Sequence, residues 1–332
     1  MNHSETLLEI KDLCVEFKTM AGTVHAVDHL SYTLHRGEKL GIVGESGSGK
    51  SVSSLAMMQL IPNPPGKVTG GQILYNGKDL VKLSEREMEK IRGNEISMIF
   101  QEPMTSLNPV FRIGEQVDEV IALHNPQMTK EQVKARTIEM LDMVGIANKE
   151  GVYRMYPHEL SGGMRQRICI AMALACNPKL IIADEPTTAL DVTIQAQVLD
   201  LLRNLKDKIN SSIMLITHDL GVVAEMADYV VVMYAGRVVE KGTAREIFKD
   251  PRHPYTIGLM NSKPVVGKHI DKLYSIPGSV PNPVDMPNYC YFKDRCEMCV
   301  EECEGAYPAA YHVSPTHVVS CYRCKEGGTQ NE

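Results

Sequence analysis

Residues 44–51 read Gly44-Glu45-Ser46-Gly47-Ser48-Gly49-Lys50-Ser51 and follow the pattern G-x-x-x-x-G-K-S. The apolar stretch at 39–43 predicts a short strand before it, and the residues from Ser51 to Leu60 predict a helix after it. Glycines let backbone amides turn toward one point, and the start of a helix adds positive potential there. The stretch therefore predicts a phosphate-binding loop, in which Lys50 reaches the β- and γ-phosphates and Ser51 ligates Mg²⁺.

A pair of acidic residues follows an apolar stretch much further along the chain. Residues 180–183 are continuously apolar, as in a buried strand, and Asp184 and Glu185 come directly after them. Ligands of open α/β sheets bind at the carboxyl ends of the strands. We therefore expect Asp184 to support the Mg²⁺ shell and Glu185 to orient and deprotonate an attacking water. The alternative is two acids that merely end a strand, which the phosphate loop upstream disfavours.

The order of the expected elements indicates the fold class. Strands are predicted at 7–17, 27–34, 39–43, 180–183 and 213–216, with a hairpin at 229–240. Strands that feed helices predict an α/β fold, here a P-loop NTPase core with an inserted helical subdomain at about 103–160. Prolines and cysteines crowd the end of the chain, so we expect a main domain at 1–250 and a loop-rich extension at 251–332.

Composition excludes several classes of partner. The 332 residues include 35 basic and 41 acidic residues, a net charge of −6, so no basic excess points to nucleic acid. No apolar run approaches the roughly 18 residues that cross a bilayer, and the N-terminal residues do not resemble a secretory signal. We therefore expect a cytosolic chain whose membrane contact goes through partners.

Six of the nine cysteines lie in the last 43 residues. They are Cys290, Cys296, Cys299, Cys303, Cys321 and Cys324. Thiolates at such spacings suit Zn²⁺ or an iron–sulfur cluster, and a reducing cytosol disfavours disulfides. Taken alone, the two C-x2-C pairs, Cys296/Cys299 and Cys321/Cys324, favour a zinc site.

A further stretch supports a resemblance to a known family. Residues 160–164, Leu-Ser-Gly-Gly-Met, resemble the signature motif of ABC ATPases, with Met164 where glutamine is usual. Other positions match the rest of that pattern in order: Phe17 (adenine stacking), Gln101 (Q-loop), Asp184 and Glu185 (acid pair), Ala189-Leu190-Asp191 (D-loop) and His218 (switch histidine). The resemblance covers about Leu7 to Phe248 and implies an ABC ATPase core.

The resemblance also implies an assembly and roles for these residues. ABC ATPases work as a head-to-tail dimer with a second ATPase subunit, so Ser161, Gly162 and Gly163 would serve the ATP of the partner subunit. Gln101 would sense Mg²⁺ and water, and His218 would contact the γ-phosphate. For Phe17, a role in the strand core stays open as the alternative to adenine stacking.

Three segments narrow the resemblance to peptide-importer ATPases. They are 101–109 (QEPMTSLNP), 253–256 (HPYT) and 276–278 (IPG). This subfamily implies two permease membrane subunits, an extracytoplasmic solute-binding protein and a location at the cytoplasmic face of the cell membrane. The helical portion would contact a permease. Nickel, glutathione and opine importers share this ATPase type and stay open, as do a non-transport ABC ATPase, an iron–sulfur sensor with a vestigial ATPase and an exporter.

The resemblance changes the expectation for the cysteines. ATPases of this kind carry C-x5-C-x6-C and a later cysteine, a pattern associated with a [4Fe–4S] cluster. The matching residues here are Cys290, Cys296, Cys303 and Cys321, which leaves Cys299 and Cys324 as extra thiols. Zinc and free thiols stay as alternatives. We expect any metal to staple a tail with little core of its own.

Overall fold

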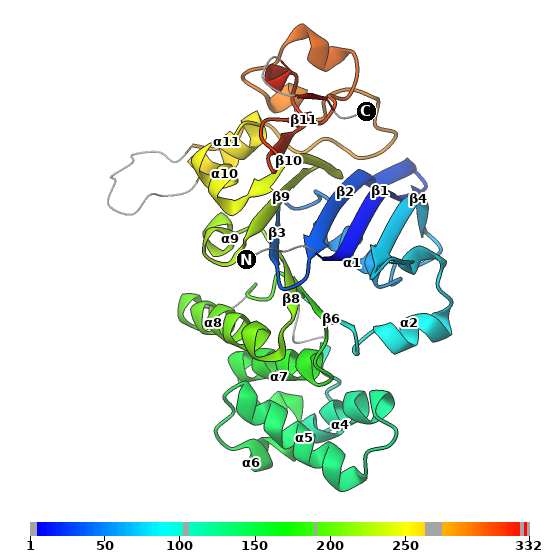
Figure 1. Cartoon of the computed structure of the whole chain (residues 1–332), viewed down its shortest axis with the longest axis vertical. Helices are drawn as coiled ribbons and strands as arrows, with labels where there is room; N and C mark the ends of the chain where they lie inside the picture. The colour runs from blue at the N-terminus through cyan, green and yellow to red at the C-terminus, as the bar shows by residue number, and fades with distance from the viewer. Residues whose placement is uncertain (1–4, 102–105, 189–190, 263–273, 326–328, 331–332) are drawn as a thin grey trace. The chain divides into compact units, whose positions relative to one another are not determined.

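The computed structural model describes residues 5–101, 106–188, 191–262, 274–325 and 329–330 (Figure 1). The chain forms two compact units. Residues 83–216 make up the first, and the segments before and after them make up the second. The phosphate loop therefore belongs to the second unit, whereas the acid pair belongs to the first. The domain boundary expected near residue 250 stays a prediction.

The first unit contains three parallel strands. They are β6 (Ile96–Ile99), β7 (Leu180–Asp184) and β8 (Ser212–Thr217), with β7 in the middle. Every residue of β7 and β8 is buried, which explains why both segments are apolar without alternation. The strands predicted at 180–183 and 213–216 are thus confirmed.

Helices account for most of the rest of this unit. They are α2 (Glu85–Ile91), α4 (Ile113–His124), α5 (Lys130–Met143), α6 (Lys149–Tyr153), η2 (Pro157–Glu159), α7 (Gly162–Leu174) and α8 (Val192–Ile209). Helices α4, α5 and α7 pack against one another. Thr129 caps α5 and completes a capping box with Gln132, so the helix begins where its polar signal lies. The helical character expected between 103 and 160 is confirmed for the described residues, whereas 102–105 lie outside them.

An antiparallel sheet forms one part of the second unit. Its strands are β2 (Gly22–His35), β1 (Thr6–Thr19), β4 (Gly66–Tyr75) and β5 (Lys78–Asp79), in that spatial order. Buried residues recur along β1 and β2, which confirms the strands predicted at 7–17 and 27–34.

A second group of strands in this unit carries the phosphate loop. Strand β3 (Lys39–Val43) pairs in parallel with β9 (Tyr229–Tyr234), and β9 turns through Ala235 and Gly236 into β10 (Arg237–Thr243). Both turn residues have positive φ, 46° and 85°, so the predicted hairpin is confirmed with glycine at the turn. Short strands of the extension continue from β10: β12 (Val318–Val319), β11 (Tyr311–His312) and β13 (Thr329–Gln330).

The helices of the second unit are short. They are α1 (Lys50–Met57), α9 (Leu220–Met226), α10 (Ala244–Lys249), α11 (Pro254–Asn261) and the 3₁₀ turns η1 (Leu80–Lys82), η3 (Lys293–Arg295), η4 (Glu301–Glu304) and η5 (Tyr322–Cys324). Helix α1 ends before the predicted Leu60 because Gln59 adopts a left-handed backbone, with φ 50°. Nowhere in the described chain is there a helix with the length and apolarity needed to span a membrane.

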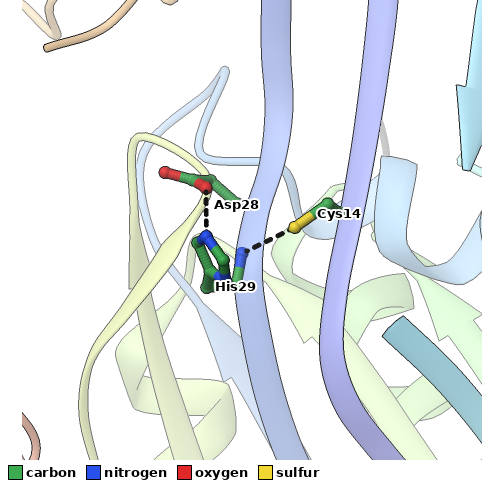
Figure 2. Close-up of side chains that lie close together, drawn as sticks. All are labelled: Cys14, Asp28 and His29. Carbon is green, nitrogen blue, oxygen red and sulfur yellow. Dashed lines mark hydrogen bonds and ion pairs between the residues drawn. The ribbon is translucent and has the colours of Figure 1, made fainter. Parts of the chain in front are cut away.

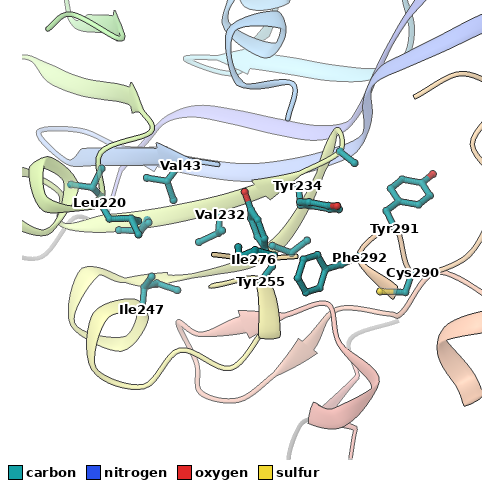
Figure 3. Close-up of a cluster of buried hydrophobic side chains, with 14 of the residues drawn as sticks. Val43, Leu220, Val232, Tyr234, Ile247, Tyr255, Ile276, Cys290, Tyr291 and Phe292 are labelled. Carbon is teal, nitrogen blue, oxygen red and sulfur yellow. The ribbon is translucent and has the colours of Figure 1, made fainter. Parts of the chain in front are cut away.

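The extension shares a hydrophobic core with the strands that carry the phosphate loop (Figure 3). Val43 and Val232 lie in the same buried cluster as Tyr255, Ile276 and Phe292. The aromatic residues of the extension thus pack into the core of the unit, which agrees with the expectation of a tail with little core of its own.

Candidate functional site

The phosphate loop has a backbone that only glycine tolerates at two places. Gly44 has φ 158° and Gly49 has φ 90°. A Cβ atom on Gly44 would lie 2.2 Å from the carbonyl oxygen of Met233, and one on Gly49 would lie 2.4 Å from that of Ala26. The neighbouring strands therefore press directly on the loop, and the glycines of the motif are required by this packing as well as by the turn.

Lys50 is held inside the loop that precedes it. Its side chain is buried, and Nζ donates hydrogen bonds to the carbonyl oxygens of Gly44 at 2.7 Å and Glu45 at 2.9 Å. The hydroxyl of Ser48 lies 3.3 Å from the same nitrogen. A buried ammonium needs such acceptors, and they hold its charge at the position where the motif predicts the phosphates.

The other loop residues differ in exposure. Ser46 and Gly47 are exposed, Ser51 is partly buried, and Ser48 is buried, with its carbonyl oxygen accepting a hydrogen bond from the Gly236 amide at 3.1 Å. The loop is thus open toward solvent at its tip and tied at its base to the turn between β9 and β10. This arrangement leaves amide groups accessible to an anion at the tip.

The first unit brings Gln101 and Glu185 together. Strands β6 and β7 run in parallel with Ile99 opposite Ala183, so the residues that follow them emerge at the same edge. The amide Nε2 of Gln101 donates to Oε2 of Glu185 at 3.0 Å. Asp184 ends β7 as a buried residue directly before Glu185. The carboxyl end of the sheet therefore presents two acids and an amide within one small region.

The backbone of Glu185 is unusual. Its φ of 46° lies in the left-handed region, which costs a residue with a side chain about 1–3 kcal/mol. Two bonds hold this conformation: the Glu185 amide donates to the carbonyl oxygen of Ile216 at 2.8 Å, and the Thr188 hydroxyl donates to its carboxylate at 2.8 Å. Hydrogen bonds from Gln101 and Thr188 orient the carboxylate, which is the arrangement expected of a group that must orient a water.

The segment 160–164 leads into the start of helix α7. Ser161 caps α7, and its Oγ accepts a hydrogen bond from the amide of Met164 at 3.3 Å. Ser161 and Gly162 are exposed, and a Cβ on Gly163 would lie 3.3 Å from Ile194. The Met164 departure leaves this cap intact, because its contribution to the cap is a backbone amide.

Three other predicted residues have the following places. Asp191 caps α8, and its Oδ1 accepts from the Ile194 amide at 2.9 Å; Ala189 and Leu190 lie outside the described residues. His218 is exposed directly after β8. Phe17 lies half-buried on β1, opposite Gly66 of β4. The choice between adenine stacking and strand core for Phe17 stays open.

Four of the six tail cysteines share a pocket. Cys290, Cys296, Cys303 and Cys321 all line it, beside His253 and Phe292. These are the four that the family resemblance singled out, whereas Cys299 and Cys324 do not line the pocket. Burial, together with the neighbouring thiols, raises the pKa of the Cys290 and Cys321 thiols to about 12, so a metal there would displace protons on binding.

The spacing of these thiols bears on the kind of metal. Four thiolates around one zinc ion, at about 2.3 Å each, must lie within roughly 4 Å of one another. Among the described residues, no three of the tail cysteines have their sulfur atoms within 4.8 Å of one another. A four-iron cube separates its ligands more, because each thiolate binds a different iron. Among the described residues, no three tail thiols therefore stand in the close grouping that a single zinc ion requires.

One other group of three potential ligands lies together: Cys14, Asp28 and His29 (Figure 2). Asp28 is already engaged, because the Arg237 guanidinium donates to it at 2.6 Å and the Tyr291 hydroxyl at 2.7 Å. Burial opposes the charge, but these two hydrogen bonds hold the pKa of Asp28 below its ordinary value. A guanidinium in contact with the carboxylate repels a second cation, so we assign no metal to this group.

A buried carboxylate that the sequence analysis missed organises the extension. Glu240 on β10 is fully buried and accepts hydrogen bonds from the amides of Arg252 and His253, at 2.7 and 3.0 Å. The ring of His317 lies 2.7 Å from it. Its partners are 12 to 77 residues away, so no local pattern marks it. The His-Pro pair at 253–254 does carry a signal, because histidine caps α11 and proline opens it.

Comparison with known proteins extends these observations. A family model described as "ABC transporter" matches residues 27–188, and one described as "Oligopeptide/dipeptide transporter, C-terminal region" matches residues 239–303. The chain is 54% identical over 95% of its length to the oligopeptide transport ATP-binding protein OppD of Bacillus subtilis, covering 88% of that protein. It is 51% identical over 98% of its length to AppD of the same organism, covering 99%.

A solved structure agrees at the level of the core. The dimeric post-hydrolysis structure of the ATP-binding cassette MJ0796, bound to ADP and Pi, matches with a TM-score of 0.64 and 28% identity, over 72% of this chain and 99% of that one. The predicted ABC ATPase fold is thus confirmed. The phosphate loop, the acid pair, both family matches and the identity to OppD and AppD establish that this chain belongs to the ATP-binding subunits of ABC transporters that carry the oligopeptide/dipeptide C-terminal region.

Proposed function

We propose that the chain hydrolyses Mg·ATP with Glu185 as the general base. The observation that carries the proposal is the contact between Gln101 and the Glu185 carboxylate at the carboxyl end of β7. Glu185 takes a proton from water, the water oxygen bonds to the γ-phosphorus, and the bond to the β–γ bridging oxygen breaks to give ADP and phosphate. Lys50 and His218 stabilise the charge on the γ-phosphate.

Mg²⁺ supplies charge neutralisation and a template for the phosphates in this reaction. Ser51 and Gln101 would ligate it, with Asp184 supporting its shell. The buried position of Asp184 and the exposed position of Gln101 support a site at the surface of the sheet edge. Glu45, Ser46, Gly47, Ser48 and Gly49 would contact the phosphates through their backbone amides.

The active form would be a head-to-tail dimer with a second ATPase subunit. Ser161, Gly162 and Gly163 would contact the ATP on the phosphate loop of the partner, with Asp191 near the same interface. The exposure of Ser161 and Gly162 at the start of α7 supports this role, since a helix start facing solvent is available to an anion brought by another chain.

The transported solute would be a di- or oligopeptide. The C-terminal match and the names of the relatives support this assignment. The chain would then act at the cytoplasmic face of the cell membrane, bound to two permease subunits that receive solute from an extracytoplasmic binding protein. No nucleic-acid partner is proposed.

We further propose that Cys290, Cys296, Cys303 and Cys321 hold a [4Fe–4S] cluster. Their shared pocket supports it, and so does the finding that, among the described residues, no three of their sulfur atoms lie within 4.8 Å of one another, as one zinc ion would require. The thiolates would bind the irons, and the cluster would tie residues 290–321 together as a structural staple.

The cluster proposal is tested by iron and zinc analysis of anaerobically purified protein. Cys303→Ala should abolish bound iron, and Cys299→Ala, the matched control outside the pocket, should retain it. Zinc at one ion per chain in the wild type, or loss of metal in both variants, would contradict the proposal.

Transport is tested by uptake of a labelled dipeptide in cells carrying the intact operon or its Glu185→Gln variant. Loss of dipeptide uptake in the variant supports both the base and the substrate class. Parallel assays of nickel and glutathione distinguish the other solutes: loss of one of them, with dipeptide uptake unchanged, would keep the ATPase and overturn the peptide assignment.

A further inference from the structure

Two residues of the C-terminal extension form hydrogen bonds with one residue of the phosphate loop, Glu45. The Arg295 guanidinium pairs with the Glu45 carboxylate through two nitrogens, Nη1 to Oε2 at 2.9 Å and Nη2 to Oε1 at 3.3 Å. The amide of the same residue donates to the hydroxyl of Tyr255 at 2.8 Å. Both the side chain and the backbone of Glu45 are thus held by residues more than 200 positions away in the sequence.

The side chains of Arg295 and Tyr255 are themselves held in place by other residues. Arg295 is 7% exposed at its side chain, and its Nε donates to the carbonyl oxygen of Pro277 at 2.8 Å. Tyr255 is fully buried, and the ring centroids of Tyr234 and Phe292 lie 4.7 and 5.4 Å from its own (Figure 3). Because packing and other hydrogen bonds already fix these two side chains, they lose little conformational entropy when they bond to Glu45.

Glu45 brings a negatively charged side chain into the phosphate loop. It follows Gly44, and its carbonyl oxygen already accepts from Lys50 at 2.9 Å, so its backbone forms part of the cradle. Its carboxylate adds a negative charge beside a site for a triphosphate, which by itself weakens anion binding. The bidentate pair with a guanidinium cancels that charge and at the same time fixes where the residue points.

We propose that Arg295 and Tyr255 are positioning residues for ATP binding: they neutralise Glu45 and hold its part of the phosphate loop in the shape that receives the phosphates. The proposal rests on the proposed function, because it assumes that this loop binds ATP. It makes the extension a part of the ATP site of its own chain. Arg295 directly precedes Cys296, which lines the cysteine pocket. A change in the structure of that pocket would therefore affect the bonds from Arg295 to Glu45.

The test is ATP affinity in a four-member cycle of the full chain: wild type, Arg295→Gln, Glu45→Gln and the double variant. Arg295→Gln should weaken ATP binding about tenfold, because it leaves a bare carboxylate beside the phosphates. Glu45→Gln should change it by no more than about threefold, and the double variant should recover to near that level, since the repelling charge is gone. In the assembled transporter, KM for ATP should rise with kcat nearly unchanged.

Lys293→Gln is the matched control. Lys293 lies in the same 3₁₀ turn and pairs with Glu304, away from the phosphate loop, so its removal should leave ATP affinity unchanged. Tyr255→Phe is the second variant: it keeps the buried ring, removes only the hydroxyl, and should weaken ATP binding about threefold even if Arg295→Gln does not fold.

The outcomes separate the two proposals. Wild-type affinity in Arg295→Gln, or in Tyr255→Phe where Arg295→Gln does not fold, would overturn this inference and leave the ATPase intact. A double variant as weak as Arg295→Gln would overturn the electrostatic argument. A wild-type chain that binds no ATP would overturn the proposed function itself, and this inference with it.

Discussion

The phosphate loop and the C-terminal extension are built in opposite ways. In the loop, eight consecutive residues form the cradle, and Lys50 bonds to carbonyls only five and six positions away. In the extension, the key bonds join residues far apart: Arg295 to Glu45 across 250 positions and His317 to Glu240 across 77. A local arrangement is visible in a motif, whereas a long-range one is invisible until the chain folds.

The difference also separates chemistry from support. The loop and the acid pair hold the charged groups that we propose act on ATP, whereas the polar groups of the extension hold other residues in place. If this comparison is right, changes at the acid pair should abolish turnover without affecting stability, and changes in the extension should act through stability or affinity.

The largest effect is expected at the acid pair. Glu185→Gln should lower kcat for ATP hydrolysis about 10³-fold, since general-base catalysis contributes about 10²–10⁴-fold. ATP affinity and thermal stability should change little. Phosphate release by the assembled transporter measures it, with Glu139→Gln, an exposed residue of the same unit, as control. A loss smaller than tenfold would exclude Glu185 as the base.

The second-largest effect should appear only in the free energy of unfolding. Glu240→Ala removes a fully buried carboxylate and leaves two amides and His317 without their acceptor, which should cost about 3 kcal/mol or more. Urea unfolding followed by tyrosine fluorescence suits a chain with 13 tyrosines and no tryptophan. Glu225→Ala, on the exposed side of α9, is the control. Equal midpoints for the two variants would refute a supporting role for Glu240.

Acid should weaken the extension through His253. Burial lowers the pKa of His253 to about 4, although the charge of Glu240 opposes the shift. The unfolded chain takes up a proton near its ordinary pKa of about 6.5, so stability should fall by up to roughly 3 kcal/mol as pH drops from about 6.5 to about 4. Unfolding curves at pH 7, 6, 5 and 4.5 measure this.

The variant His253→Asn separates the contribution of His253 to acid sensitivity from that of the acidic residues. Hydrogen bonds from Ser314 and Thr243 lower the pKa of Glu246 to about 2 against the effect of burial, so its contribution is lost only below about pH 4.5. His253→Asn keeps a helix cap and removes the titrating ring. It should be less stable than wild type at pH 7 but flatter between pH 6.5 and 4.5. An unchanged slope would assign the acid sensitivity to other groups.

The smallest effect is expected at Gln101. Gln101→Ala removes one hydrogen bond to Glu185 and one proposed Mg²⁺ ligand. Because Ser51 and the Glu185 carboxylate remain, kcat should fall only about tenfold, far less than on loss of the carboxylate. Gln127→Ala, in an exposed turn, provides the control for phosphate-release assays. A loss equal to that of Glu185→Gln would mean that Gln101 itself carries the chemistry.

By itself, the sequence determined the local features of this protein. Its glycines, apolar runs and caps specify the phosphate loop, the buried strands β7 and β8 and the start of α7, because these depend on backbone geometry and on neighbours within a few residues. It also placed Glu185 at the end of a buried strand, whereas the strand β6 before Gln101 came only from the structure.

Only the tertiary structure decided which contacts the extension makes. The cysteine spacings by themselves left zinc and iron–sulfur sites open, and the structure places the four thiols that the family resemblance singled out in one pocket. The hydrogen bonds of Arg295 and Tyr255 with Glu45 could not be predicted, because neither residue stands in a pattern that points to a partner more than 200 positions away. Long-range contacts depend on how whole elements pack, and packing is not encoded in any short stretch of residues.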